Sequence, residues 1–263
     1  MMKIPSKLIL LTRPFRYAVN RLTYSMASKR GGLVALKDCH KDKPMVIIGN
    51  GPSLNKTPLD DFAHVPSIGM NKIDMIFSRV KWRPSYIVCN NGLVVKQHAD
   101  VFAKSEIPVF LSWKNKRSLP KTTKSVEYFL STISREFSTD ISKGVGSAAT
   151  VTYTALQMAY YMGANPIIIF GVDHSFKYEG KANDISKREG EDQNHFDPNY
   201  FKSGSYWGVP NLDLSEKAYL ASRIAFEADG RKIYDATIGG KLTIFDKITL
   251  NEAKALVSEN KTP

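Results

Sequence analysis

Short apolar runs alternate with longer segments of helical pattern along most of the chain. The apolar runs are almost continuous, as strands covered on both faces must be, and they span residues 45–49, 67–71, 85–91, 107–113, 166–173 and 232–237. Apolar residues at helical spacing span 147–163 and 214–230. Each of these two segments ends at a glycine that can act as a C-cap, Gly163 or Gly230. This alternation predicts an α/β fold, with a mostly parallel sheet and helices on both faces.

The first 37 residues differ from the rest in charge. They hold eight Lys and Arg and no acid, whereas the whole chain of 263 residues has a net charge of +12. Apolar residues recur there at helical spacing, at Leu8, Leu11, Phe15, Val19, Leu22 and Met26. Because proline is tolerated in a first turn, we predict a helix that begins at Thr12 and has Pro14 in that turn. The chain therefore divides into a basic amphipathic segment, residues 1–40, and one larger domain, residues 41–263.

Two interpretations of the N-terminal helix stay open. A basic amphipathic helix can lie in the interface of an anionic membrane, which would make the membrane surface a partner. In the second interpretation, the apolar stripe packs on the body of the protein and the basic face is solvated. Nucleic acid is not an expected partner, because aromatic stacking positions do not interleave with the cations.

Several observations favour a cytoplasmic protein. The sequence has no stretch of about 18 apolar residues that would span a membrane. Arg13 and Arg16 interrupt the apolar run near the start, so a signal peptide is not expected. The two cysteines, Cys39 and Cys89, indicate neither a disulfide framework nor a ligand cluster, which favours a reducing compartment. We expect a cytoplasmic protein, peripheral on the inner membrane under the first interpretation, and the oligomeric state stays open.

Residues 177–211 fit neither a strand pattern nor a helix pattern. The segment is too long for an ordinary connection and is rich in Gly, Asp, Asn and Lys. It also holds aromatic residues at Tyr178, Phe196, Tyr200, Phe201, Tyr206 and Trp207. Long loops of this kind are often lids, and the aromatic side chains predict that this one folds onto a site.

Polar residues and glycines follow four of the predicted strands. They are Gly49, Asn50, Gly51, Pro52 and Ser53 after the first strand, Asn71 after the second, Asn90 after the third, and Gly171, Asp173 and His174 after the strand at 166–173. In a parallel sheet, ligands bind past the carboxyl ends of the strands at a switch point. We therefore expect these residues to meet in one crevice.

The residue types at these strand ends suit a nucleotide. An asparagine amide offers a donor and an acceptor without charge, which suits ribose hydroxyls, a base edge and phosphate oxygens. Gly49 and Gly51 would allow the backbone to approach a phosphate, and the amides near Ser53 would donate to it. Alternatively, each asparagine caps its own strand or turn. The spacing matches neither the G-x-G-x-x-G dinucleotide motif nor the P-loop.

The motifs "IIGNGPSL", "GMN", "VCNN" and "GVD" resemble those of two related groups over roughly residues 44–245. One is the bacterial sialyltransferases that use a CMP-activated sugar. The other is the wider Rossmann-like family named after the archaeal 6-hydroxymethylpterin diphosphokinase, which includes proteins assigned to surface-glycan assembly. The resemblance implies a Rossmann-like nucleotide-binding domain and, from the first group, transfer of a CMP-linked sugar.

The resemblance also implies roles for single residues. The matching positions hold ribose and phosphate (Asn50, Ser53), contact phosphate (Asn71), read the cytidine (Asn90) and form the cytidine-side loop (Gly171, Asp173). Ser147 corresponds loosely to a serine at a helix N-terminus. The chain departs from the sialyltransferases at His174, where they have a tyrosine, and this puts a phosphate contact there in doubt.

Transfer of a sugar to a hydroxyl needs a base and a group that stabilises the leaving phosphate. His195, which is flanked by Asp197, is the first candidate for the base. Tyr200 is a candidate donor to the leaving phosphate. His174 is the second candidate for the base, and a structural role for His195 in the lid is the alternative.

The residues and this resemblance together predict a metal-independent glycosyltransferase, and the resemblance implies that it moves a sialic-acid-like sugar from a nucleotide donor to a cell-surface glycan acceptor. The sequence predicts no cofactor, because no carboxylate pair follows a strand and no His or Cys spacing suits zinc. One alternative is a diphosphokinase of the pterin type, which would use ATP and Mg²⁺ near Asp173. A second alternative is a non-catalytic nucleotide-binding protein of the membrane surface.

Overall fold

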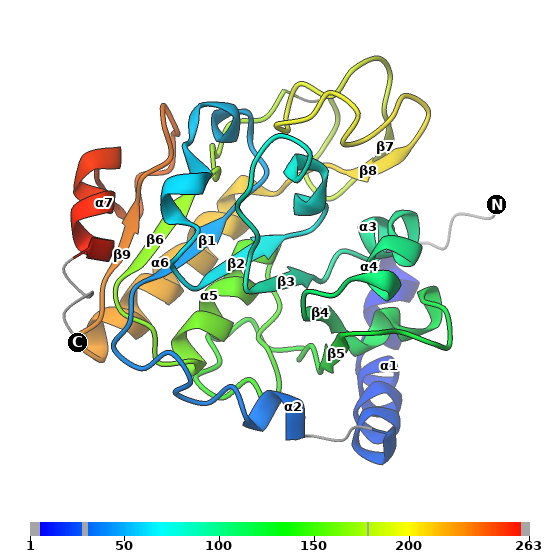
Figure 1. Ribbon diagram of the computed structural model, residues 1–263. Coiled ribbons are helices and arrows are strands. Elements are labelled where there is room, and N and C mark those ends of the chain that lie inside the picture. Colours follow the sequence, from blue (N-terminus) through cyan, green and yellow to red (C-terminus); the bar gives the residue numbers. More distant parts are fainter. Residues whose placement is uncertain (1–5, 28–30, 178, 259–263) are drawn as a thin grey trace.

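An eight-stranded sheet, in which all neighbouring strands are parallel, forms the centre of the structure. In spatial order its strands are β10 (Asp246–Lys247), β9 (Ile233–Asp235), β6 (Ile167–Phe170), β1 (Met45–Ile48), β2 (Ser67–Met70), β3 (Tyr86–Cys89), β4 (Val109–Ser112) and β5 (Val126–Phe129). The computed structural model describes residues 6–27, 31–177 and 179–258. Helices lie on both faces of the sheet (Figure 1), which confirms the predicted α/β, Rossmann-like fold.

Each of the six apolar runs contains one strand of this sheet. The strands β1, β2, β4 and β6 are buried along their whole length, which explains their continuous hydrophobicity. The sequence pattern missed β5 and β10, which form the two edges of the sheet. The exposed Glu127 interrupts β5, because an edge strand is not covered as the central strands are.

Alternate residues of β1 enter two separate cores, one on each face of the sheet. Val46 and Ile48 pack in the core that includes residues of η1 (Pro52–Lys56), η2 (Leu59–Phe62), η3 (Ile73–Ile76), α3 (Gly92–Gln97), α4 (Ala99–Lys104) and α7 (Leu250–Ser258). Met45 and Ile47 pack in the core that includes residues of α2 (Gly31–Val34), α5 (Val151–Tyr161) and α6 (Leu212–Ala228).

Both predicted helices of the domain are present, with shifted ends. α5 begins at Val151, because the Thr150 side chain caps it by accepting from the Thr152 amide. The glycines that follow α5 and α6 have positive φ angles, +78° at Gly163 and +71° at Gly230. This left-handed conformation favours glycine and ends a helix, as the sequence predicted.

The 177–211 segment packs on the sheet with its aromatic side chains. Within it, β7 (Ile185–Lys187) and β8 (Tyr206–Gly208) form a two-stranded antiparallel hairpin (Figure 1). Of the aromatic residues named above, Phe196, Tyr200, Phe201 and Trp207 are buried in the core that contains Val46. Tyr206 is exposed, and Tyr178 lies outside the described residues.

The N-terminal helix α1 (Ser6–Ala27) lies at the periphery beyond β5 (Figure 1). It already includes Ser6 and carries Pro14 in its interior, so the predicted start at Thr12 is wrong. It packs through Tyr24 and Thr23, against Trp113 and Tyr128. In the described part of the chain, no helix has the length and apolarity needed to cross a bilayer.

Candidate functional site

The carboxyl ends of the central strands border one cavity of about 430 Å³, which we call the strand-tip cavity. It lies beside β1, where the strand order reverses, because β2 follows on one side and β6 lies on the other. The predicted site residues that line it are Gly49, Asn50, Gly51, Asn71, Asn90, Gly171, Asp173, His174 and His195. The predicted site residues outside its lining are Pro52, Ser53, Ser147 and Tyr200.

The loop after β1 is fastened to the loop after β6. The Ser53 amide donates to Asp173 Oδ1 at 3.0 Å, and the Ser53 hydroxyl donates to Asp173 Oδ2 at 2.7 Å. The Gly51 amide donates to the Gly171 carbonyl at 2.9 Å. A Cβ at Gly49 would overlap the Gly171 carbonyl, and a Cβ at Gly51 would overlap the Asp173 carboxylate. The glycines therefore let two protein loops approach each other.

This geometry corrects two predictions about the β1 tip. The amides near Ser53 were expected to donate to a phosphate, but the structure directs both the amide and the hydroxyl of Ser53 to Asp173. Pro52 begins η1 and does not line the strand-tip cavity. The part of the "GNGPS" motif that faces the cavity is therefore its first half, Gly49 to Gly51.

The three asparagines predicted at the strand ends all line the strand-tip cavity. Asn50 Nδ2 donates to the Met70 carbonyl at 2.9 Å, and Asn90 Nδ2 donates to Thr154 Oγ1 at 2.8 Å. The Oδ1 atoms of Asn50 and Asn71 are buried, and no donor among the described residues reaches either one. A buried oxygen without a donor costs about 1–3 kcal/mol, so these two oxygens point to a ligand or a bound water.

The first turn of α5 forms another wall of the cavity, with residues 148–152 in the lining. A helix N-terminus presents amide N–H groups and the positive end of the helix dipole, which suits a phosphate. Ser147 was expected at this position. Its hydroxyl instead donates to the Thr132 carbonyl at 2.7 Å, and Thr150 caps the helix.

Lys114 is a cation in the cavity lining that the sequence reasoning missed. It lies in η4 (Trp113–Ser118), two residues after the end of β4, and is exposed. The rule that located the asparagines, a polar residue after a parallel strand, would have found it. Together with the α5 N-terminus, it makes this side of the cavity suitable for an anion.

His195 is held in one orientation at the cavity wall. Its Nδ1 atom lies 2.8 Å from Asp192 Oδ2, and its ring stacks on the Tyr200 ring with 4.0 Å between centroids. The following amide, that of Phe196, donates to the Asn50 carbonyl at 2.9 Å. These contacts fix the imidazole relative to the tip of β1.

The partner of His195 determines which of its nitrogens can act as a base. Burial raises the pKa of the Asp192 carboxyl, but His195, the Asn194 amide and Arg188 together lower it by more, so the net pKa lies below the ordinary value. An ionised carboxylate accepts from Nδ1–H, which leaves the lone pair of a neutral imidazole on Nε2. The sequence reasoning placed Asp197 beside His195, and Asp192 takes that place.

Tyr200 lies beneath the strand-tip cavity, with 1% of its surface exposed. Its hydroxyl accepts from the Lys72 amide at 3.3 Å, and burial raises its pKa. Lys72 Nζ in turn donates to the Tyr200 carbonyl at 2.8 Å. The prediction that Tyr200 donates to a leaving phosphate is therefore wrong. The structure gives Tyr200 the role of supporting the His195 ring.

His174 lines the cavity with a positive φ of +51°. Its Nε2 lies 2.9 Å from Glu216 Oε1, and its ring meets the edge of the Tyr219 ring. Glu216 is half exposed, whereas Asp192 is buried, so solvent screens the His174 pair more strongly. His195 therefore has the less screened carboxylate partner of the two histidines.

Among residues 6–27, 31–177 and 179–258, no group of three or more His, Cys, Asp or Glu is placed to hold a metal ion. Among the described residues of the cavity lining, Asp173 is the one carboxylate, and both of its oxygens accept from Ser53. Mg²⁺–nucleotide sites use carboxylates near the phosphates, so the residues present fit such a site poorly.

Comparison with known proteins places the site in a family. A family model described as "6-hydroxymethylpterin diphosphokinase MptE-like" matches residues 24–179. Among curated proteins, none matches the chain. The structure of the MAf glycosyltransferase from Magnetospirillum magneticum AMB-1 is similar in fold, with a TM-score of 0.52 and 13% identity over 84% of this chain. The match covers 36% of that longer chain.

Proposed function

The chain belongs to the 6-hydroxymethylpterin diphosphokinase MptE-like family, and from this membership and the strand-tip cavity we propose that it is a nucleotide-sugar-dependent glycosyltransferase. We propose a CMP-linked, sialic-acid-like donor and a cell-surface glycan acceptor. The observation that carries the proposal is one cavity lined by the three strand-end asparagines, Asn50, Asn71 and Asn90, and by the oriented His195. The glycosyltransferase named in the solved structure of similar fold supports it.

The two sides of the cavity would hold different parts of the donor. The amides of Asn50, Asn71 and Asn90 would bind the ribose and the base, because they offer uncharged donors and acceptors. The phosphate would lie at the N-terminus of α5, near Lys114, because both favour an anion. The predicted ligand contacts of Gly49, Gly51 and Gly171 would be made by backbone atoms.

In the proposed reaction, His195 Nε2 takes the proton of an acceptor hydroxyl while that oxygen attacks the anomeric carbon of the sugar. The bond from the anomeric carbon to the phosphate oxygen breaks, and the nucleotide leaves with the electron pair. Asp192 then stabilises the imidazolium through Nδ1. Positive charge at the α5 N-terminus and Lys114 would stabilise the leaving phosphate, and no metal ion is part of this step.

The family description favours a second candidate function, a diphosphokinase that uses ATP and Mg²⁺. Both oxygens of Asp173 already accept hydrogen bonds from Ser53, which argues against a diphosphokinase that binds Mg²⁺ through this carboxylate. A third possibility is binding of a nucleotide without catalysis.

Ligand binding separates these functions. We expect CMP, tested by calorimetry without metal, to bind the wild-type chain, and Asn50→Ala to weaken that binding roughly tenfold, the loss of about one hydrogen bond. Asn199→Ala, in an exposed residue of the 177–211 segment, is the matched control and should bind as the wild type. Binding of ATP with Mg²⁺ but not CMP would favour the diphosphokinase. Binding of CMP without release of CMP from CMP-sialic acid would favour a non-catalytic protein.

A further inference from the structure

The helix α1 presents an apolar stripe to solvent, made of Phe15, Val19, Leu22 and Met26. Their exposed fractions are 73%, 43%, 62% and 80%. The residues follow one another at intervals of four, three and four, so they form a single line along the helix. Four large apolar side chains exposed in one line indicate that this face of α1 is covered by another apolar surface, such as a membrane or a protein.

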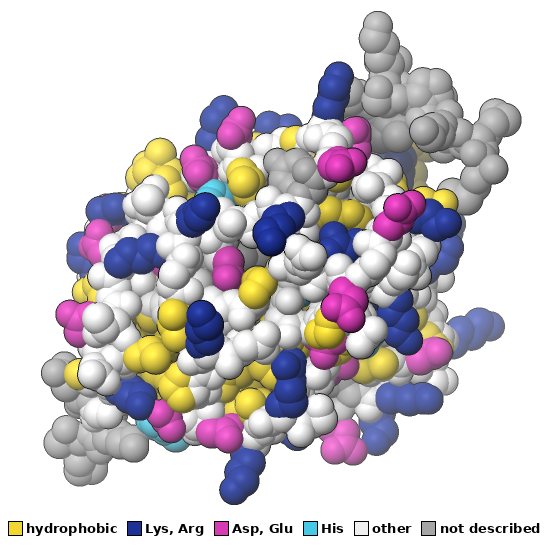
Figure 2. All heavy atoms as spheres, turned by 90° about the horizontal axis from the view of Figure 1, so that it is seen from above, with side chains coloured by type: hydrophobic (Ala, Val, Ile, Leu, Met, Phe, Trp, Pro, Cys, Tyr) yellow, Lys and Arg dark blue, Asp and Glu magenta, His cyan; other side chains and the backbone are white. Residues whose placement is uncertain are grey.

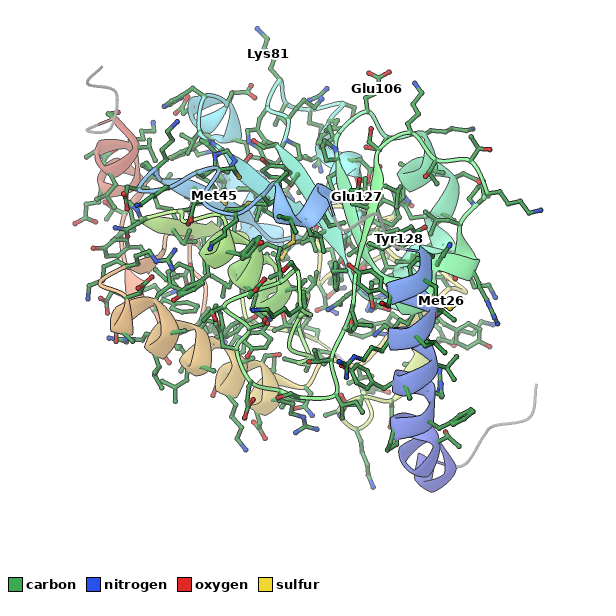
Figure 3. The ribbon with its side chains drawn as sticks, turned by 90° about the horizontal axis from the view of Figure 1, so that it is seen from below. Met26, Met45, Lys81, Glu106, Glu127 and Tyr128 are labelled. Atoms are coloured by element: carbon green, nitrogen blue, oxygen red, sulfur yellow. The ribbon has the colours of Figure 1, made fainter. Side chains whose placement is uncertain are left out.

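Tyr24, on the side of α1 opposite the stripe, and Thr23, at the edge of the stripe, fix the helix to the protein, so the stripe is held outward. Trp113 Nε1 donates to Thr23 Oγ1 at 2.9 Å, and the Tyr24 hydroxyl donates to the Tyr128 carbonyl at 3.0 Å. The Tyr24 and Trp113 rings also meet edge to face, with 5.5 Å between centroids. Figure 3 shows α1 at the periphery, with the Met26 end near Tyr128. For Phe15, Val19, Leu22 and Met26, the second interpretation, in which the stripe packs on the body, is therefore wrong. The side chains of Leu8 and Leu11 lie outside the described part of the structure.

Exposed cations flank the stripe on both sides. At about 100° per residue, Arg16 lies roughly 100° to one side of Phe15 and Arg21 roughly 120° to the other. The sequence of α1 contains no acidic residue. By contrast, acidic side chains are scattered between the basic ones on the face seen in Figure 2.

This charge pattern identifies what covers the stripe. A second copy of the chain, packed stripe to stripe, would bring Arg16 and Arg21 near the same cations of its partner, with no acid in α1 to offset them. An anionic bilayer accepts apolar side chains at the boundary of headgroups and acyl chains, and its headgroups attract the arginines. The long arginine side chains can reach the headgroups while the stripe is immersed.

We propose that α1 docks the protein on an anionic lipid bilayer, with the helix parallel to the surface and the apolar stripe immersed. This surface is separate from the strand-tip cavity and does not depend on the reaction assigned to the cavity.

Sedimentation of the full chain with lipid vesicles tests the proposal. We expect the wild type to bind vesicles that contain phosphatidylglycerol, to bind pure phosphatidylcholine much more weakly, and to lose binding as salt rises. The double variant Phe15→Ser/Leu22→Ser should reduce binding to the anionic vesicles by about tenfold or more. Arg16→Gln/Arg21→Gln should reduce the preference for phosphatidylglycerol.

A matched control removes the same kind of side chain elsewhere. Leu220 and Ile224 are exposed apolar residues on α6, and Leu220→Ser/Ile224→Ser should bind vesicles as the wild type does. Equal binding by Phe15→Ser/Leu22→Ser and the wild type would overturn the proposal. Failure of the wild type to bind anionic vesicles would also overturn it. So would a wild-type dimer that becomes a monomer in Phe15→Ser/Leu22→Ser alone among the variants, because a second copy would then cover the stripe.

Discussion

The two sides of the strand-tip cavity use their polar groups differently. On the β1 side, Ser53 and Asp173 bond to each other and Gly51 bonds to Gly171, so these groups are satisfied within the protein, whereas the Asn50 Oδ1 atom in the same loop has no donor among the described residues. On the other side, the first turn of α5 and His195 face the cavity. The most recognisable motif in the sequence, "GNGPSL", therefore serves largely to hold the loop after β1 against the loop after β6. Under the proposed function, the base and the groups that bind the phosphate lie outside that motif.

The largest expected effect concerns the His195 side of this comparison. Under the proposed function, His195→Ala should lower turnover of CMP-sialic acid by roughly 10²- to 10⁴-fold, because the base is removed, and leave CMP affinity nearly unchanged. The measurement is release of CMP, with calorimetry of CMP binding beside it. His64→Ala, in an exposed residue outside the cavity, is the control and should retain full turnover. Unchanged turnover in His195→Ala would reject His195 as the base.

The second effect concerns the β1 side and is one of stability. Gly51→Ala should lower the free energy of unfolding by about 3 kcal/mol, because its Cβ would overlap the Asp173 carboxylate and force the two loops apart. Urea denaturation at neutral pH measures it.

The control for that experiment is Gly208→Ala, because a Cβ at Gly208 would meet no atom within 4 Å. Its free energy of unfolding should stay within about 0.5 kcal/mol of the wild type. If Gly51→Ala were as stable as Gly208→Ala, the close contact between the loops after β1 and β6 would not contribute to stability.

The smallest effect is the pH dependence contributed by Asp192. Its native pKa lies below the ordinary value, so its stabilising contribution is present above that value and is lost as pH falls through the native pKa. The difference in unfolding free energy between the wild type and Asp192→Asn should therefore be largest near neutral pH. It should shrink as pH falls below the ordinary aspartate value of about 3.9 and through the native pKa of Asp192.

Urea denaturation at a series of pH values measures this difference. His195→Ala removes one of the groups that lower the pKa of Asp192, so this variant should show part of the same change. A difference between the wild type and Asp192→Asn that stays constant from neutral to acidic pH would contradict the assignment.

Most of the sheet could be predicted from the sequence, because central parallel strands are buried on both faces and so have continuous apolar runs. The edge strand β5 could not, because Glu127 is exposed and the pattern is broken. The start of α1 was missed because Pro14 was read as part of a first turn, whereas the helix accommodates it in its interior.

The site was predictable where it follows strand ends and unpredictable where it depends on the 177–211 segment. Asn50, Asn71 and Asn90 were located by one rule, and the same rule extends to Lys114. The pairing of Asp192 with His195 follows from a loop without periodicity, so sequence spacing could not distinguish Asp192 from Asp197 as the partner.

The short helix η4 connects two regions that are otherwise separate. Trp113 packs on α1, and the adjacent residue, Lys114, belongs to the cavity lining. The residue on which α1 rests is therefore the immediate neighbour of a cation in the wall of the ligand chamber. A protein seated on a bilayer through α1 would hold the Lys114 side of its chamber close to that helix.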